Sequence, residues 1–241
     1  MLAPFNSVEK ACEAVSAIFR AGITPSALEL MEIESIKLAS KICDSTAIPI
    51  TDGLAAHLII EVDGNDIDVL MKEMEAISAV LENFEVGELY FADDAQQKNE
   101  LWKIRRKANE AAVAAGYTIE EDTVVPRAEL PRLIKGVKAF ADENGFKVVS
   151  YGHAGDGNLH IRINHPTIKK SYENEQIQAI LAKIFELVKS LGGTISGEHG
   201  IGLIQKSFMP IMFEKANMDL MKGIKKVFDP HHILNAGKIF D

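Results

Sequence analysis

Two short strand-like runs that follow one another closely restrict the fold more than any other feature of this chain. Residues 146–153 and 158–165 both read as β-strands, and Asp156-Gly157 lies between them. Asp-Gly is preferred in the two-residue type I′ turn of a β-hairpin, because both central residues need positive φ. We therefore predict an antiparallel strand pair with His153 directly opposite His160. This pair excludes an all-parallel sheet.

The rest of the chain alternates between helix-like and strand-like periodicity. Helices are predicted over residues 8–21, 31–43, 66–84, 93–115, 128–143, 171–191 and 214–228, and strands over 55–62, 86–91 and 117–125. This order indicates one α+β fold: a largely antiparallel sheet covered on one side by helices, with a small helical lead-in and a helical C-terminal segment. A stripe of apolar residues recurs at helical spacing and is predicted to pack in the core: Ile67, Leu70, Met71, Met74, Ile77 and Leu81.

Composition excludes several classes of function. The chain has 26 Lys and Arg against 35 Asp and Glu, a formal charge of −9, so nucleic acid is not an expected partner. No window approaches about 18 consecutive apolar residues, so we predict no transmembrane segment, and residues 1–10 do not resemble a signal peptide. Cys12 and Cys43 have no CxxC spacing and are expected to be buried thiols in a reducing compartment. The expected location is the cytoplasm.

The hairpin motif is a candidate metal site. Leu159, Ile161 and Ile163 form one face of the second strand, so His160 lies on the polar face. Directly opposed residues on an antiparallel pair have Cβ atoms about 4.5–5.5 Å apart, which lets His153 and His160 share one divalent metal ion. The alternative is a pair of ordinary polar histidines on an exposed strand pair.

A glycine-rich segment, residues 193–202, carries the adjacent pair Glu198-His199. Neighbouring side chains of an extended chain point in opposite directions, so Glu198 would complete the metal site while His199 faces the reacting molecule. Two histidines and one carboxylate with an open position are typical of a catalytic metal. The alternative is a turn with a solvated Glu198. A phosphate-binding loop is disfavoured because no Gly-Lys-Ser/Thr follows.

Two further segments have weaker signals. Residues 98–107 hold Trp102 and five basic side chains, which form either the solvated face of a helix or, through Arg105, a site for a small carboxylate. From the residues alone, the solvated face is favoured. The adjacent His231 and His232 follow a proline at the end of a helix, and we interpret both as structural.

Three motifs occur in a defined order, and together they resemble a known family. They are Gly152-His153-Ala154-Gly155-Asp156-Gly157-Asn158-Leu159-His160, Gly197-Glu198-His199-Gly200-Ile201-Gly202, and Phe228-Asp229-Pro230 with Asn235-Ala236-Gly237-Lys238. The chain resembles the C-terminal half of FAD-linked oxidases, the glycolate oxidase, D-lactate dehydrogenase and D-2-hydroxyglutarate dehydrogenase group of vanillyl-alcohol-oxidase-type flavoproteins. The resemblance implies a substrate-binding cap domain over 1–195 and a flavin-facing segment over 196–241. The resemblance further implies that the family's N-terminal FAD-binding domain lies outside this chain.

The resemblance also assigns roles. His153, His160 and Glu198 would hold a divalent zinc, iron or manganese ion that chelates the hydroxyl and carboxylate of a small 2-hydroxy acid. His199 would be the catalytic base that takes the hydroxyl proton as hydride leaves C2 for the flavin, and catalytic Arg105 would clamp the substrate carboxylate.

Other positions follow from the same motifs. Asn158 would contact the substrate, and the positions expected beside the flavin are Glu198, His199, Gly200 and Asn235. From the residues alone, residues 98–107 are interpreted as the solvated face of a helix. The resemblance instead assigns Arg105 of this segment to the substrate carboxylate.

The chain also departs from the family pattern. Arg106 stands where an acidic residue is common, and Glu120 lies where the hydroxyglutarate branch has a lysine for a second carboxylate. D-lactate or glycolate is therefore the expected substrate. The expected activity is that of an FAD-dependent oxidoreductase that needs a separate FAD-binding domain or subunit. The alternatives are a non-catalytic, metal-binding accessory protein and, last, a metal hydrolase.

Overall fold

The computed structural model describes residues 1–92, 94–165, 172 and 174–240, and it is built on one six-stranded sheet. The strand order is β1-β3-β2-β5-β6-β4, and every neighbouring pair is antiparallel. The strands are β1 (Leu2–Phe5), β2 (Ala27–Glu32), β3 (Ala56–Glu61), β4 (Ile119–Val124), β5 (Lys147–Gly152) and β6 (Asn158–Asn164). The predicted α+β class and antiparallel sheet are confirmed.

Strands at the beginning of the chain are the main difference from the predicted elements. The helical lead-in is wrong in part, because β1 precedes the first helix and β2 occupies residues 27–32 before the second. The predicted strand 86–91 is reduced to isolated bridges from Val86 to Phe5 and from Tyr90 to Leu2. β1 has only four residues, too few to show a period of two.

Except for the four-residue helix Met209–Met212, which the sequence pattern does not predict, the helices agree closely with the predicted ranges. They are α1 (Val8–Arg20), α2 (Ile33–Cys43), α3 (Ile67–Leu81), α4 (Ala95–Ala114), α5 (Leu130–Asn144), α6 (Glu175–Ser190), α7 (Met209–Met212) and α8 (Lys215–Phe228). Ser7 caps α1 by accepting a hydrogen bond from the Lys10 backbone N–H. Asp93 and Ser171, the predicted starts of two helices, lie outside the described residues.

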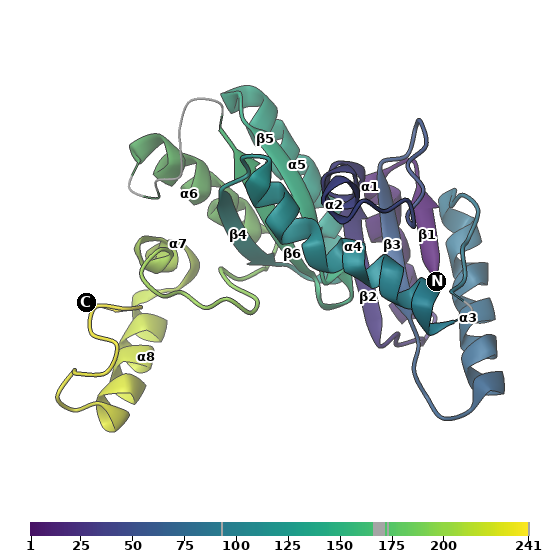
Figure 1. The fold of residues 1–241 in the computed structure, drawn as a ribbon. Coiled ribbons are helices and arrows are strands. Elements are labelled where there is room, and N and C mark those ends of the chain that lie inside the picture. The colour runs from purple at the N-terminus through teal and green to yellow at the C-terminus, as the bar shows by residue number, and fades with distance from the viewer. Residues whose placement is uncertain (93, 166–171, 173, 241) are drawn as a thin grey trace.

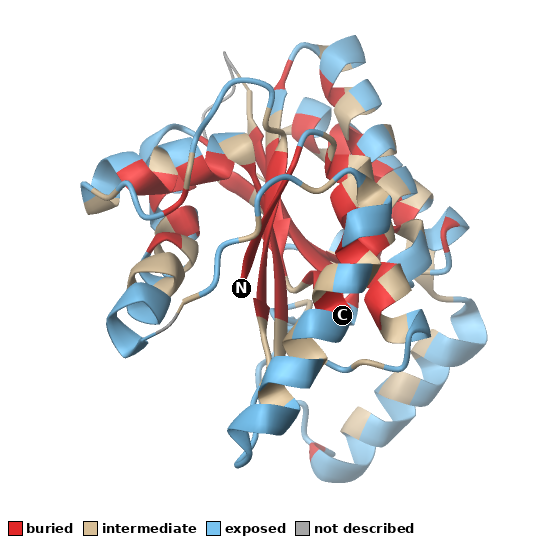
Figure 2. Ribbon diagram, turned by 90° about the vertical axis from the view of Figure 1, so that its right-hand side faces the viewer, coloured by how far each residue is buried: buried red, intermediate tan, exposed pale blue. Residues whose placement is uncertain are grey.

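Helices cover both faces of the sheet, so the prediction of a one-sided cover is wrong (Figure 1). One face packs Leu28, Leu30 and other apolar residues against α1, α5 and α6. The opposite face packs Met31 and Tyr151 against apolar residues of α2 and α4. Figure 2 shows the resulting buried sheet with helices whose outer surfaces are exposed. The sequence did not predict the apolar core between the sheet and α2 and α4, because the apolar stripe of α4 is weak and lies among many charged residues.

The apolar stripe of α3 is buried only near its end. Ile77 and Leu81 are in the core, whereas Ile67 and Met71 are 69% and 54% exposed, so the prediction that the whole stripe packs in the core is wrong. The exposed half lines a cavity of about 700 Å³ beside β3 and Trp102. Cys12 is buried as predicted, and Cys43 is only partly buried.

The hairpin between β5 and β6 has a longer connection than predicted. Ala154–Asp156 form a short 3-10 turn, and the Asn158 backbone N–H donates to the His153 carbonyl oxygen. His160 consequently pairs with Tyr151 and not with His153. Gly157 has φ 75°, and a Cβ there would lie 2.1 Å from the Val125 carbonyl oxygen, so this glycine ends the 3-10 turn instead of forming a two-residue turn.

The C-terminal segment with α7 and α8 lies near the β4 end of the molecule, away from β1 (Figure 1). Gln205 attaches it to the sheet by donating to the Glu121 carboxylate of β4 over 2.9 Å. Burial raises the pKa of Glu121 to about 8. Within the described part of the chain, no helix is long and apolar enough to cross a membrane.

Candidate active site

A pocket of about 280 Å³ brings together most of the predicted site residues. Its walls come from α4, from strands β4, β5 and β6, and from the glycine-rich segment. The lining residues are Trp102, Arg105, Arg106, Asn109, Glu120, Tyr151, His153, His160, Glu198 and His199. Residues separated by almost a hundred positions in the sequence thus face one small cavity.

His153, His160 and Glu198 form a donor set that fits a divalent metal. Nε2 of His153 and Nε2 of His160 lie 3.7 and 3.5 Å from the same Glu198 oxygen, Oε1. Ligand atoms around a tetrahedral zinc ion are roughly 3.4 Å apart, given metal–ligand distances of about 2.0–2.2 Å. The observed spacing and the nitrogen and oxygen donors therefore suit Zn²⁺ or a similar ion.

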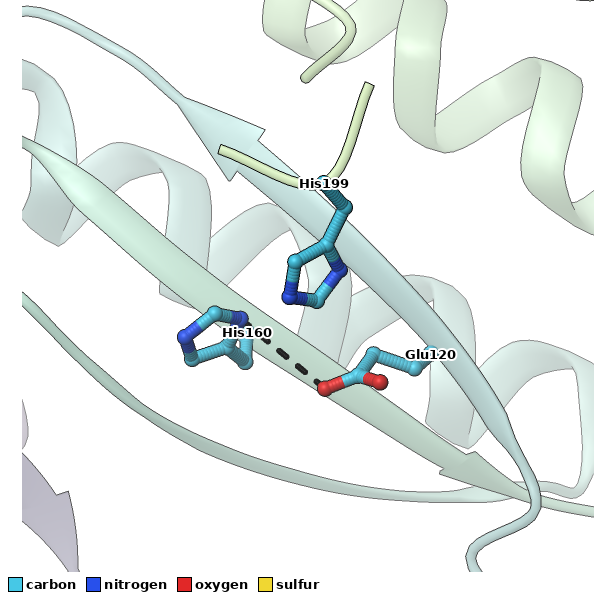
Figure 3. Close-up of side chains that lie close together, drawn as sticks. All are labelled: Glu120, His160 and His199. Atoms are coloured by element: carbon cyan, nitrogen blue, oxygen red, sulfur yellow. Dashed lines mark ion pairs between the residues drawn. The ribbon is translucent and has the colours of Figure 1, made fainter. Parts of the chain in front are cut away.

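The environment of His160 favours its neutral form, which is the form that binds metals. Its side chain is 8% exposed, and burial, followed by the charge of Arg105, lowers the pKa of His160 to about 4. Its Nδ1 makes no hydrogen bond within the described residues and lies 3.9 Å from Glu120. Figure 3 shows this contact and His199, whose ring stacks on that of His160. Glu120, His160 and His199 thus form a second possible metal-binding group.

Asp122 of β4 holds the Glu198-His199 segment in place. Its Oδ2 accepts hydrogen bonds from the backbone N–H groups of Gly197, Glu198 and His199 over 2.7–2.9 Å, and from the Ser196 hydroxyl. This turn directs both Glu198 and His199 into the pocket, so the prediction that they point in opposite directions is wrong. The segment is not extended, because three consecutive N–H groups converge on one oxygen.

Replacing Asp122 with asparagine is expected to lower the free energy of unfolding by about 2 kcal/mol near pH 7. Burial opposes ionisation, but hydrogen bonds from His199, Asn158 and Glu198 lower the pKa of Asp122 from 3.8 to about 2. Since the folded-state pKa is below the unfolded value, the stabilisation is complete above about pH 4 and is lost as the pH falls towards 2. Urea unfolding near pH 7 and near pH 2.5 measures both values.

Asp156→Asn is the matched control for this change, because Asp156 is exposed on the hairpin loop. We expect it to alter stability by less than about 0.5 kcal/mol. A deficit in Asp122→Asn of the same size at both pH values would contradict the assigned role of the Asp122 charge.

Arg105 enters the pocket from α4, and a buried carboxylate holds it. Its Nε donates to Oε2 of Glu29 over 2.8 Å, and its guanidinium lies 5.4 Å from the centre of the Tyr151 ring. The terminal nitrogens of Arg105 make no hydrogen bond with any described residue, so they are free to receive a carboxylate. The second Glu29 oxygen, Oε1, lies 2.6 Å from Nδ1 of His153.

The contacts of Glu29 with His153 and Arg105 shift the pKa values of Glu29 and His153. Burial alone would raise the pKa of Glu29, but the hydrogen bond with His153 and the charge of Arg105 hold it below its ordinary value. The hydrogen bond to Glu29 in turn raises the pKa of His153.

Three predicted residues do not line the pocket. Asn158 is buried, and its amide donates to Asp122 and to the Thr123 carbonyl oxygen. Gly200 is exposed at the turn, where its N–H donates to the Ser196 hydroxyl. Asn235 is exposed in the C-terminal segment and accepts from Lys238. Their roles toward substrate and flavin stay predictions.

Sequence reasoning gave no role to Glu29 or Asp122. A signal was present for Glu29, because its apolar neighbours Leu28 and Leu30 predict a buried strand. Asp122 lies between Glu121 and Thr123, so its neighbours give no such signal. Glu29 was missed because residues 27–32 were not recognised as a strand. Tyr151 was not predicted to line the pocket, because the predicted register placed His153, and not Tyr151, opposite His160.

The fold of this chain is similar to that of two solved structures. The fold resembles 4-ethylphenol oxidase from Gulosibacter chungangensis, with a TM-score of 0.64 and 12% identity over 99% of this chain and 53% of that chain. It also resembles alkyldihydroxyacetonephosphate synthase, with a TM-score of 0.57 and 13% identity over 97% of this chain and 43% of that chain. At these identities the similarity concerns the fold alone.

The sequence identifies the family. Residues 1–239 match the family described as FAD linked oxidases, C-terminal domain, and the chain belongs to it. The resemblance found in the motifs is thereby confirmed, and the domain is part of an oxidoreductase family.

Curated relatives agree with this membership. Glycolate oxidase subunit GlcD of Bacillus subtilis is 34% identical over 100% of this chain, and D-lactate dehydrogenase of Anaerostipes hadrus is 32% identical over 99% of it. The chain spans only 50% and 51% of the length of these two proteins.

Proposed function

We propose that this chain is the substrate-binding half of an FAD-dependent oxidoreductase that oxidises a small 2-hydroxy acid, D-lactate or glycolate, to the 2-oxo acid. The observation that carries the proposal is the convergence of a three-donor metal set, Arg105 and His199 on one small pocket. The names of the two relatives, a glycolate oxidase subunit and a D-lactate dehydrogenase, support the same substrate class.

Each side chain has a task in this reaction. Arg105 would bind the substrate carboxylate through its free terminal nitrogens. His153, His160 and Glu198 would hold a divalent metal, which lowers the pKa of a bound hydroxyl. His199 would take the hydroxyl proton, since an imidazole suits proton transfer near neutral pH. Bound FAD supplies the acceptor for the hydride from C2.

The pocket favours a short substrate with one carboxylate. Its volume of about 280 Å³ is below the usual range of about 300–1,000 Å³ for small-molecule sites. Glu120 lies on its wall and forms an ion pair with Arg162 over 2.6 Å. The second Glu120 oxygen faces His160 and would repel a distal carboxylate. We therefore place 2-hydroxyglutarate behind D-lactate and glycolate as a substrate.

A separate FAD-binding domain would cover the C-terminal segment, residues 196–241. Leu220, Ile224 and Val227 share one face of α8 by their spacing, and each is more than half exposed. Phe228, at the end of the helix, is 79% exposed. Exposed apolar residues of this density mark an interaction surface. The relatives are about twice as long as this chain, which is consistent with a further domain covering this surface of α8.

Reconstitution with a separately produced FAD-binding domain tests the proposal. We expect the mixture to reduce an artificial electron-accepting dye with D-lactate or glycolate, and more slowly with 2-hydroxyglutarate. The chain alone should give no turnover. Isothermal titration of the chain with Zn²⁺, then with D-lactate, reports binding independently of turnover.

Two outcomes would contradict the proposal in different ways. Dye reduction that stays at background with every 2-hydroxy acid, despite metal and D-lactate binding, would favour a non-catalytic accessory protein. Absence of metal binding would remove the site itself.

A further inference from the structure

Glu29 is a buried carboxylate in the middle of the sheet. It lies on β2 between Leu28 and Leu30, whose side chains pack in the core on the opposite face. Glu29 is 4% exposed. Burial of an unpaired carboxylate is strongly unfavourable, so its retention in an apolar strand requires partners with good geometry.

Each oxygen of Glu29 has one such partner, and the two partners belong to different parts of the candidate site. Oε1 lies 2.6 Å from Nδ1 of His153, at the end of β5. Oε2 accepts from Nε of Arg105, on α4, over 2.8 Å. One carboxylate on a third element therefore joins a candidate metal ligand to the candidate carboxylate-binding arginine.

The contact with His153 determines which ring nitrogen is available. A carboxylate accepts hydrogen bonds, so Nδ1 carries a proton and donates it toward Glu29. Nε2 is then left with its lone pair, and it is Nε2 that lies 3.7 Å from Glu198 on the side of the pocket. The contact with Arg105 has an equivalent effect, because it uses Nε and leaves the terminal nitrogens for a ligand.

We propose that Glu29 is a positioning residue that fixes the tautomer of His153 and the direction of Arg105 together, and so sets the affinity for both the metal ion and the substrate carboxylate. This inference rests on the proposed function, because it takes the metal and the 2-hydroxy acid as the ligands of the pocket. Carboxylates that orient metal-binding histidines usually contribute about 10–100-fold to metal affinity.

Glu29→Gln is the informative variant. Glutamine has one acceptor oxygen and one NH₂ group, so one of the two donors, His153 or Arg105, meets another donor. If the NH₂ faces His153, the ring takes the tautomer with a proton on Nε2, and Nε2 then has no lone pair for the metal. We expect Zn²⁺ to bind about 10–100-fold more weakly, and D-lactate to bind more weakly to the Zn²⁺-loaded chain.

Glu32→Gln is the matched control. Glu32 lies on the same strand and is also 4% exposed, but it accepts from the Ser150 N–H and pairs with Lys138, and it does not line the pocket. It should lose stability without a change in Zn²⁺ affinity. Isothermal titration with Zn²⁺ alone compares the wild-type chain with both variants.

A second measurement does not depend on any variant. Long-range ¹H–¹⁵N spectra of the histidine rings report which nitrogen of His153 carries the proton. In the Zn²⁺-loaded wild type, we expect the proton on Nδ1 and the metal on Nε2. A proton on Nε2, or wild-type affinities for both Zn²⁺ and D-lactate in Glu29→Gln, would overturn the inference.

The outcomes also separate this inference from the proposed function. If the wild type binds Zn²⁺ and His160→Ala does not, the metal site stands, and Glu29→Gln then decides the role of Glu29 alone. If the wild type does not bind Zn²⁺, the metal site of the proposed function fails, and the role of Glu29 in metal affinity is overturned with it.

Discussion

His160→Ala is expected to remove the divalent metal from the chain and to bring turnover of the reconstituted enzyme to background. His160, whose Nε2 is 3.5 Å from Glu198 Oε1, belongs to both possible donor groups. No three-residue group found among the described residues therefore remains after its loss. Removing a side chain that only orients a ligand costs about 10–100-fold in metal affinity, and the loss of a ligand should exceed this. Metal content by mass spectrometry and the Zn²⁺ affinity by titration measure the effect.

His231→Ala is the control, because His231 is exposed in the C-terminal segment and lies outside both donor groups. It removes one histidine without touching the pocket and should leave the metal content unchanged. Circular dichroism and thermal unfolding establish that His160→Ala is folded. A folded His160→Ala chain that keeps its metal would show that the donor set is assigned wrongly.

His199→Asn is expected to lower kcat of the reconstituted enzyme by about 10²–10⁴-fold, the usual contribution of a general base. His199 is 44% exposed and faces the pocket, with Nε2 3.9 Å from Glu198 Oε1. Asparagine keeps a polar side chain of moderate size but cannot take the hydroxyl proton. Because His199 lies outside the predicted metal set, the affinities for Zn²⁺ and D-lactate should change little.

Single-turnover reduction of FAD in the reconstituted enzyme isolates the chemical step from product release. His231→Asn serves as the control for a general effect of the substitution. Unchanged FAD reduction in His199→Asn would show that another group takes the proton. Equal losses in kcat and in Zn²⁺ affinity would instead assign His199 to the metal, as in the group with Glu120 and His160.

Local periodicity predicted most of the helices and strands β3, β4, β5 and β6 correctly, because it reports which side of each element is buried. It failed where an element is too short to show a period, as in β1, or where a neighbouring helical pattern extended over a strand, as in β2. The cover of helices on the second face was missed for a related reason, because α4 buries small residues such as Ala108 and Ala111 among its charges.

The hairpin shows how a correct grouping can follow from a wrong register. His153 and His160 do face one pocket, but His160 pairs with Tyr151. The 3-10 turn over 154–156 places the His153 ring 5.9 Å from that of His160. The Asp-Gly pair alone could not distinguish the two connections, because Gly157 adopts positive φ in both.

The sequence by itself determined the α+β class, the antiparallel hairpin, the family and the order of the motifs that carry His153, His160, Glu198 and His199. Those properties depend on local patterns and on residue identities. The tertiary structure alone decided which side chains act on one another: Glu29 on His153 and Arg105, and Asp122 on the Glu198-His199 turn. The reason is physical. A buried charge is tolerated only where partners from distant segments meet it, and no local pattern records where those segments meet.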